Sequence, residues 1–160
     1  MTSRHGPLTA LDGTAPALAV GDVLVRHVRL TPAGVAWHAG DERREFVPWV
    51  DVDRVSIDVP KTWMPHPLVS DWTRSIIETA LGGGGDYHHV EPYFARVVFR
   101  GGDEELWEVD RHYVSGYRRR DARAAARLVD HLGAEPSSRA LLAQPSEIIA
   151  RISTILRSAT

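Results

Sequence analysis

The sequence contains no cysteine among its 160 residues. This absence excludes a disulfide scaffold, a cysteine-ligated zinc or iron–sulfur site and a cysteine nucleophile. An excess of positive charge is also missing, because 19 Lys and Arg residues face 21 Asp and Glu residues and leave a net charge of −2. Such a balance excludes a nucleic-acid-binding protein that relies on bulk positive charge. Lys61 is the only lysine, and this bias towards arginine is typical of a genome rich in G and C.

Long hydrophobic runs are absent as well. No stretch approaches the roughly 18 consecutive apolar residues of a membrane-spanning helix, and no apolar run near the N-terminus has the form of a signal peptide. We therefore expect a cytoplasmic protein. What the sequence does have is 43% hydrophobic residues and five tryptophans, which excludes a disordered acidic chain and predicts a folded core.

The chain divides into three parts by composition. Residues 1–21 are small and polar and contain Pro7 and Pro16, so we expect an extended arm. Residues 22–132 carry the regular patterns of one domain, with an insertion at 60–92. Residues 133–160 form a helical extension.

Alternating apolar and polar residues predict short strands on both sides of the insertion. Helical spacing predicts a helix over 68–81 within the insertion, a second over 117–132 that Gly133 ends, and a third over 146–157. The strands are predicted over 23–30, 35–39, 45–49, 55–59, 93–100 and 104–110. The core is predicted to contain Trp37, Trp49, Val55, Ile57, Val97, Phe99, Trp107, Leu128 and Leu132.

Three segments together resemble a bacterial PH-like (pleckstrin-homology-like) domain. They are the strand, turn and strand of 30–37 (LTPAGVAW), the bulky-Pro-Trp step of 46–55 (FVPWVDVDRV), and the hairpin 93–110 followed by the helix 117–132. The resemblance implies an α+β fold in which a strongly bent antiparallel sheet, close to a barrel, is capped by that helix. Domains of this kind bind lipids, peptides or proteins or act as scaffolds, so the resemblance alone does not choose among functions.

The insertion contains the first group of candidate binding residues. His and carboxylate side chains are typical ligands of Zn²⁺, so the segment 86–91 (DYHHVE) opens the alternative of a metal-dependent enzyme in which His66 or His112 completes the site. No complete metal or catalytic motif is present, and we assign neither a catalytic residue nor a cofactor. The candidate binding residues of the insertion are Trp63, His66, Tyr87, His88 and His89.

The second group lies at the start of the helix predicted over 117–132. Arg118, Arg119 and Arg120 belong to the segment 111–127, which holds six arginines and one aspartate, whereas the preceding segment 103–110 holds five acids and no base. Arginines at a helix N-terminus oppose the helix dipole. They suggest either a surface for an anionic lipid or phosphorylated partner, or local pairing with the acidic segment.

These observations favour a non-catalytic binding or scaffold module that recognises a protein or peptide partner. The metal-dependent enzyme and the anionic-lipid-binding module stay as alternatives. The helix over 146–157 carries five large aliphatic residues on one side and is too short to be stable alone in water. Its apolar side must therefore pack either on its own sheet or on the same helix of a second chain, as in a homodimer.

Overall fold

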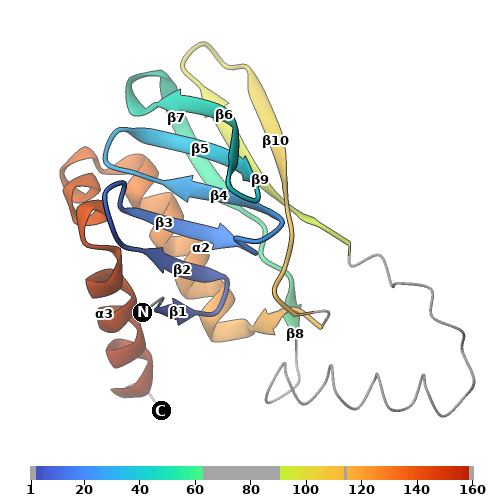
Figure 1. The fold of residues 1–160 in the computed structure, drawn as a ribbon, viewed down its shortest axis with the longest axis vertical. Helices are drawn as coiled ribbons and strands as arrows, with labels where there is room; N and C mark the ends of the chain where they lie inside the picture. The colour runs from blue at the N-terminus through green and yellow to red at the C-terminus, as the bar shows by residue number, and fades with distance from the viewer. Residues whose placement is uncertain (1–2, 63–90, 114, 159–160) are drawn as a thin grey trace, which may run out of the picture.

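The computed structural model describes residues 3–62, 91–113 and 115–158. Within these residues the fold is α+β, with strands in three sheets and helices at the C-terminal end (Figure 1). The strands are β1 Arg4–His5, β2 Leu8–Leu11, β3 Ala17–Gly21, β4 Arg26–Leu30, β5 Gly34–Ala39, β6 Glu42–Pro48, β7 Val52–Ile57, β8 Lys61–Thr62, β9 Tyr93–Phe99, β10 Glu104–Val109 and β11 Tyr117–Arg118. The helices are η1 Trp49–Asp51, α2 Arg119–Ala134, η2 Pro136–Ala143 and α3 Pro145–Ser158.

The largest sheet is an antiparallel meander in the order β1-β2-β3-β4-β5-β6. The second sheet has the antiparallel order β10-β9-β7, and β11 pairs in parallel with β8. The chain passes from the first sheet to the second through η1. At the opposite side, hydrogen bonds from Asp110 N to Arg26 O (2.9 Å) and from Asp22 N to Asp110 O (2.8 Å) join the end of β10 to the β3–β4 connection. The fold is thus the predicted bent sheet capped by a helix.

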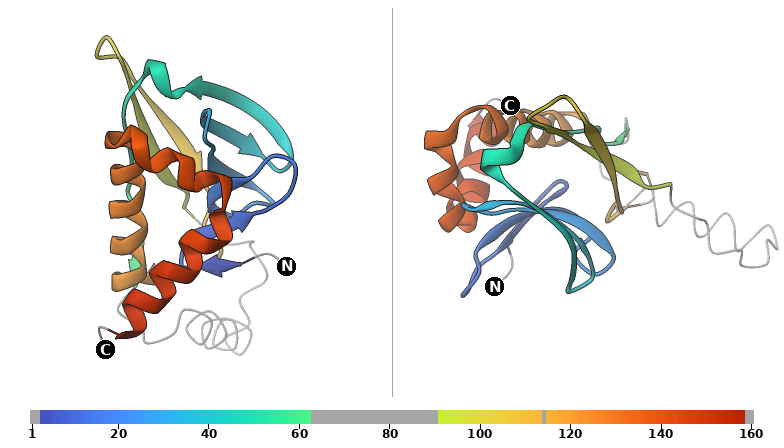
Figure 2. Two further views of the ribbon diagram at one scale, coloured as in Figure 1. Left: turned by 90° about the vertical axis from the view of Figure 1, so that its left-hand side faces the viewer. Right: turned by 90° about the horizontal axis from the view of Figure 1, so that it is seen from above.

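The core lies between the six-stranded sheet and a second layer formed by the three-stranded sheet and α2, which Figure 2 shows from above. Helix α2 packs against β7, and its buried residues recur at helical spacing. The predicted core is confirmed for Trp49, Val55, Ile57, Val97, Trp107 and Leu132, whereas Trp37, Phe99 and Leu128 are only partly buried. The buried residues of α2 are Ala122, Ala125, Val129, Leu132 and Gly133.

The prediction that residues 1–21 form an extended arm is wrong. Residues 4–21 contain β1, β2 and β3, and Leu8 and Leu18 are completely buried in the core. The segment folds because β2 and β3 pair with each other and β3 pairs with β4, so every strand gains both ladder hydrogen bonds and a buried face. Its small residues, such as Ala19, fit a position where the sheet is covered on both faces.

The C-terminal segment folds back on these N-terminal strands. Pro136 begins η2 and Pro145 begins α3, positions where a missing N–H costs the helix nothing. Helix α3 lies against β1 and β2 and buries Ile148 and Ile149. The hydrogen bond between Ser153 Oγ and His5 Nδ1 (3.0 Å) fixes its middle. The sequence left two surfaces open for this helix, its own sheet and the same helix of a second chain. Ile148 and Ile149 are buried within the chain itself.

No helix in the described part of the chain combines the length and the apolar character that a membrane crossing requires.

Candidate binding groove

The predicted site residues of the insertion fall outside the described residues. Trp63, His66, Tyr87, His88 and His89 all belong to the segment 63–90, as does the helix predicted over 68–81, so their roles stay predictions. Among the residues that the structure describes, no group of three or more His, Asp or Glu side chains is arranged to hold a metal ion.

His112, the other histidine considered for a metal site, is held by Tyr117. The backbone N–H of His112 donates to Tyr117 Oη at 2.9 Å, and its Nδ1 lies 2.9 Å from the same oxygen. Burial, followed by the positive charge of Arg4, lowers the pKa of His112 to about 4. The ring is therefore neutral at physiological pH and forms part of the packing around Tyr117, which is 1% exposed.

The arginine cluster lies where the sequence placed it, at the start of α2. Arg118 is the N-cap residue and pairs through its backbone with Thr62, while Arg119 and Arg120 are exposed in the first turn. Arg120 Nε lies 3.6 Å from Asp121 Oδ1. The sequence segment 103–110 does not neutralise the cluster in the way considered above, because Glu108 and Asp110 pair with Arg26 of β4.

The same basic side of α2 continues beyond the predicted cluster. Arg123 and Arg127 follow Arg119 at intervals of four residues, which places all three on one face of the helix. Both are exposed, and no ion-pair partner for either is found among the described residues. These two arginines contribute to the positive charge of the segment 111–127 but are not among the binding residues that the sequence predicts.

A groove runs beside this face, between α2 and the edge of β7. Strand β7 is the end strand of its sheet and pairs with β9 on one side. Two adjoining hollows of about 270 and about 650 Å³ lie along its other side and share Asp130. We call this combined feature the β7–α2 groove. Its lining residues are Asp53, Arg54, Ser56, Ile57, Asp58, Val59, Lys61, Ala122, Arg123, Ala126, Arg127, Asp130 and Ala134.

Gly133 sets how closely the two walls of the groove approach each other. A Cβ atom at this position would lie 2.9 Å from Val55 Cγ1 and 3.3 Å from Val55 N, so only glycine lets the helix backbone pack directly on the strand. Gly133 is predicted to follow the end of the helix, whereas in the structure α2 continues to Ala134. The glycine is therefore a contact residue inside the helix, and its presence before the true helix end explains the wrong boundary.

The groove has a charge gradient along its length. In the half nearer the start of α2, Lys61, Arg123 and Arg127 outnumber the acidic Asp58. In the half nearer the C-terminal end, Asp53 and Asp130 outnumber the basic Arg54. Helix residues 122–134 span 12 steps of about 1.5 Å, so the groove is about 18 Å long. An extended peptide advances about 3.3 Å per residue, so the groove matches about five residues.

A second concentration of titratable groups is buried in the six-stranded sheet. The rings of His27 and His38 stack with their centroids 5.2 Å apart, and Arg29 Nε donates to His27 Nε2 at 2.9 Å. Burial, followed by the charge of Arg29, lowers the pKa of His27 to about 3 and that of His38 to about 4. The pair is therefore neutral at physiological pH and contributes to the packing of the sheet.

Comparison of this chain with protein-family models, with curated proteins and with solved structures finds no match. The resemblance to PH-like domains therefore stays a prediction, and the function is argued from the groove itself.

Proposed function

We propose that this chain is a non-catalytic binding module that takes up an extended, acidic segment of a partner protein in the β7–α2 groove. The observation that carries the proposal is the pair Arg123 and Arg127, exposed on the wall of a groove of peptide length and without an ion-pair partner in the described part of the chain. Charged guanidinium groups in this setting favour carboxylate or phosphate groups, which they bind through paired N–H donors.

The backbone of β7 adds a second means of recognition. Asp58 N donates to Phe94 O of β9 at 3.2 Å, and because the direction of backbone groups alternates along a strand, the N–H and C=O of Ile57 point away from β9. Ile57 lines the groove. An extended peptide can therefore hydrogen-bond to this residue while its acidic side chains reach Arg123 and Arg127. Further along, the contact between Gly133 and Val55 covers the strand edge, which limits backbone pairing to the basic half of the groove.

The proposal is tested by selection from a displayed library of random ten-residue peptides on the immobilised protein, followed by fluorescence anisotropy with the selected peptides. We expect selected sequences to be rich in Asp and Glu. The variant Arg123→Glu/Arg127→Glu should weaken their binding about tenfold or more, since losing two charge pairs of roughly 0.5–1 kcal/mol each approaches a factor of ten before repulsion is added.

The matched control is Arg43→Glu/Arg44→Glu, which makes the same charge change at exposed positions of β6 outside the groove. Equal loss of binding in both variants would mean that only net charge matters, and would contradict the groove as the site. Sedimentation with phosphatidylserine vesicles tests the lipid alternative. If vesicles bind and selected peptides do not, and if Arg123→Glu/Arg127→Glu abolishes the vesicle binding, the basic face belongs to a membrane site and the peptide proposal is wrong.

A further inference from the structure

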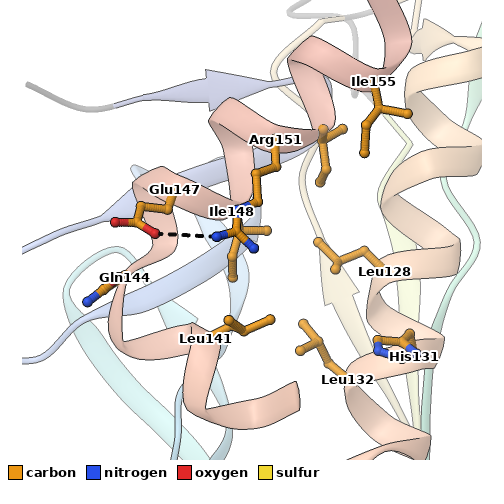
Figure 3. A pocket seen from close by; sticks show the side chains of 10 residues that line it. Leu128, His131, Leu132, Leu141, Gln144, Glu147, Ile148, Arg151 and Ile155 are labelled. Atoms are coloured by element: carbon orange, nitrogen blue, oxygen red, sulfur yellow. Dashed lines mark ion pairs between the residues drawn. The ribbon is translucent and has the colours of Figure 1, made fainter. Parts of the chain in front are cut away.

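A separate apolar groove lies on the opposite side of α2, between this helix and α3 (Figure 3). Its volume is about 160 Å³. We call it the α2–α3 groove. The aliphatic side chains that line it come from three consecutive helices and are Leu128, Leu132, Leu141, Ile148, Ile152 and Ile155.

Two of these side chains are strongly exposed at the ends of the groove. Leu141 of η2 is 49% exposed and Ile155 of α3 is 65% exposed, and Figure 3 shows them at opposite ends of the cavity. Single exposed aliphatic residues such as Leu24 are ordinary on a protein surface. Here the exposed residues continue an apolar surface that already forms a groove, which is typical of an interaction site.

Charge on the rim of the groove indicates what covers it. Glu147 and Arg151 lie one turn apart on α3, with Oε2 and Nη2 3.9 Å from each other, and their side chains are 63% and 70% exposed. A second α3 that runs antiparallel to the first brings Glu147 of each copy beside Arg151 of the other. Two-fold symmetry makes this match twice.

The apolar residues follow the same symmetry. In an antiparallel pair whose axis passes near residues 149–150, Ile155 of one helix lies opposite Gln144, the residue that precedes the start of the other helix. This register brings the exposed Ile155 to the Leu141 end of the neighbouring groove. Each copy thus supplies both an exposed Ile155 at the open end of its own groove and the cavity that receives the same residue of the other copy, as an isologous interface requires.

We propose that this chain forms a two-fold symmetric homodimer in which the α3 helices pair antiparallel and each Ile155 enters the α2–α3 groove of the other copy. The assembled interface is a layer of four helices, α2 and α3 from each chain, in which the apolar sides of all four face one another. The β7–α2 groove is not used, so the dimer and the proposed function are independent of each other.

Sedimentation velocity and light scattering test the dimer through the mass in solution. The wild-type chain is expected at twice the 17.7 kDa mass of one chain. Ile155→Asp should sediment as a folded monomer, because the residue is exposed in the single chain and its replacement leaves the core intact. Leu24→Asp is the matched control, since Leu24 is 83% exposed and lies outside the groove, and this variant should stay dimeric.

A charge-exchange experiment distinguishes a contact of α3 between two chains from a purely structural role of this helix within one chain. Glu147→Arg alone and Arg151→Glu alone should each be monomeric, because like charges then meet across the symmetry axis. An equimolar mixture of the two variants should form a heterodimer, since one chain presents two arginines where the other presents two glutamates. Circular dichroism confirms that each variant is folded.

Three results would overturn the proposal. The first is a wild-type chain that is monomeric over the whole accessible concentration range. The second is a dimer that survives Ile155→Asp, and the third is a mixture of the charge variants that stays monomeric. A wild-type monomer that binds an apolar dye, with binding lost in Ile155→Asp, would assign the groove to a small apolar ligand or to a helix of another protein.

Discussion

Acid should unfold this protein well above the pH at which carboxylates are protonated, because the buried His27 and His38 and the partly buried His112 are held in neutral form. The pKa of His27 is lowered to about 3, and those of His38 and His112 to about 4. In the unfolded chain a histidine has a pKa near 6.5. Between pH 6.5 and about 4 these histidines therefore bind protons in the unfolded state but stay neutral in the folded state.

The sign and size of the effect follow from proton linkage. Above about pH 7 both states are neutral at these sites, and the free energy of unfolding does not depend on them. Below pH 6.5 each histidine lowers that free energy by about 1.4 kcal/mol per pH unit. At pH 5 this amounts to at most roughly 2 kcal/mol for each residue. The effect is smaller for His38, whose surroundings are less fully desolvated, so solvent screens it. Even so, the loss is substantial beside the roughly 5–15 kcal/mol that is typical of a folded domain.

Urea unfolding at a series of pH values between 7.5 and 5 measures the effect. The slope of unfolding free energy against pH gives the number of protons taken up, which should rise towards three as the pH falls. His38→Gln should reduce that number by about one. His131→Gln is the matched control, because the side chain of His131 is exposed and hydrogen-bonds to Ser138 Oγ. Equal stability at pH 7 and pH 5 would refute the reasoning, as would equal changes of slope in both variants.

Three further predictions concern the packing of α2. Gly133→Ala should lower the unfolding free energy by about 1–3 kcal/mol, because the added methyl group overlaps Val55. An unchanged midpoint of urea unfolding would contradict this close contact. Leu132→Ala should lower the unfolding free energy by about 2–5 kcal/mol, since the side chain is 1% exposed. A decrease below about 1 kcal/mol in the same assay would be inconsistent with a place in the core. Arg139 donates from Nε and Nη2 to the carbonyl oxygens of Leu132 and Gly133 (3.0 and 2.7 Å) and stacks on Trp49. Because lysine cannot reproduce this planar arrangement, Arg139→Lys should lower the melting temperature almost as much as Arg139→Ala. A lysine variant as stable as the wild type would show that only the positive charge matters.

The sequence predicts β4, β5, β6, β7, β9 and β10 and the helices α2 and α3, but not the short parallel pair of β8 and β11 or the helices η1 and η2. In the predicted segments the apolar period is clear, as in Val55 and Ile57 of β7 or Ile148, Ile149 and Ile152 of α3. The N-terminal strands β2 and β3 are not predicted because their residues are mostly Ala, Leu and Gly, which are not enriched in strands. Pairing with β4 and burial on both faces decided their structure, and such tertiary effects override local preference.

The candidate site was predicted less completely, and for a different physical reason. The arginines at the start of α2 were found from local charge density. The β7–α2 groove could not be found in this way, because its two walls are far apart in the sequence and meet only in the folded chain, where α2 packs on β7 and Gly133 lies against Val55. That glycine was visible in the sequence, but a glycine near a helix end indicates termination more often than close packing.

Amide chemical-shift mapping is the most direct test of the central claim, that the β7–α2 groove binds an acidic peptide. The uniformly ¹⁵N-labelled protein is titrated with a peptide from the library selection. We expect the largest shifts at Ile57, Asp58 and Lys61 and along the exposed side of α2 from Arg119 to Asp130, with no comparable shifts in β6 or in α3. Saturable shifts confined to another surface, or the same shifts in Arg123→Glu/Arg127→Glu as in the wild type, would contradict the account.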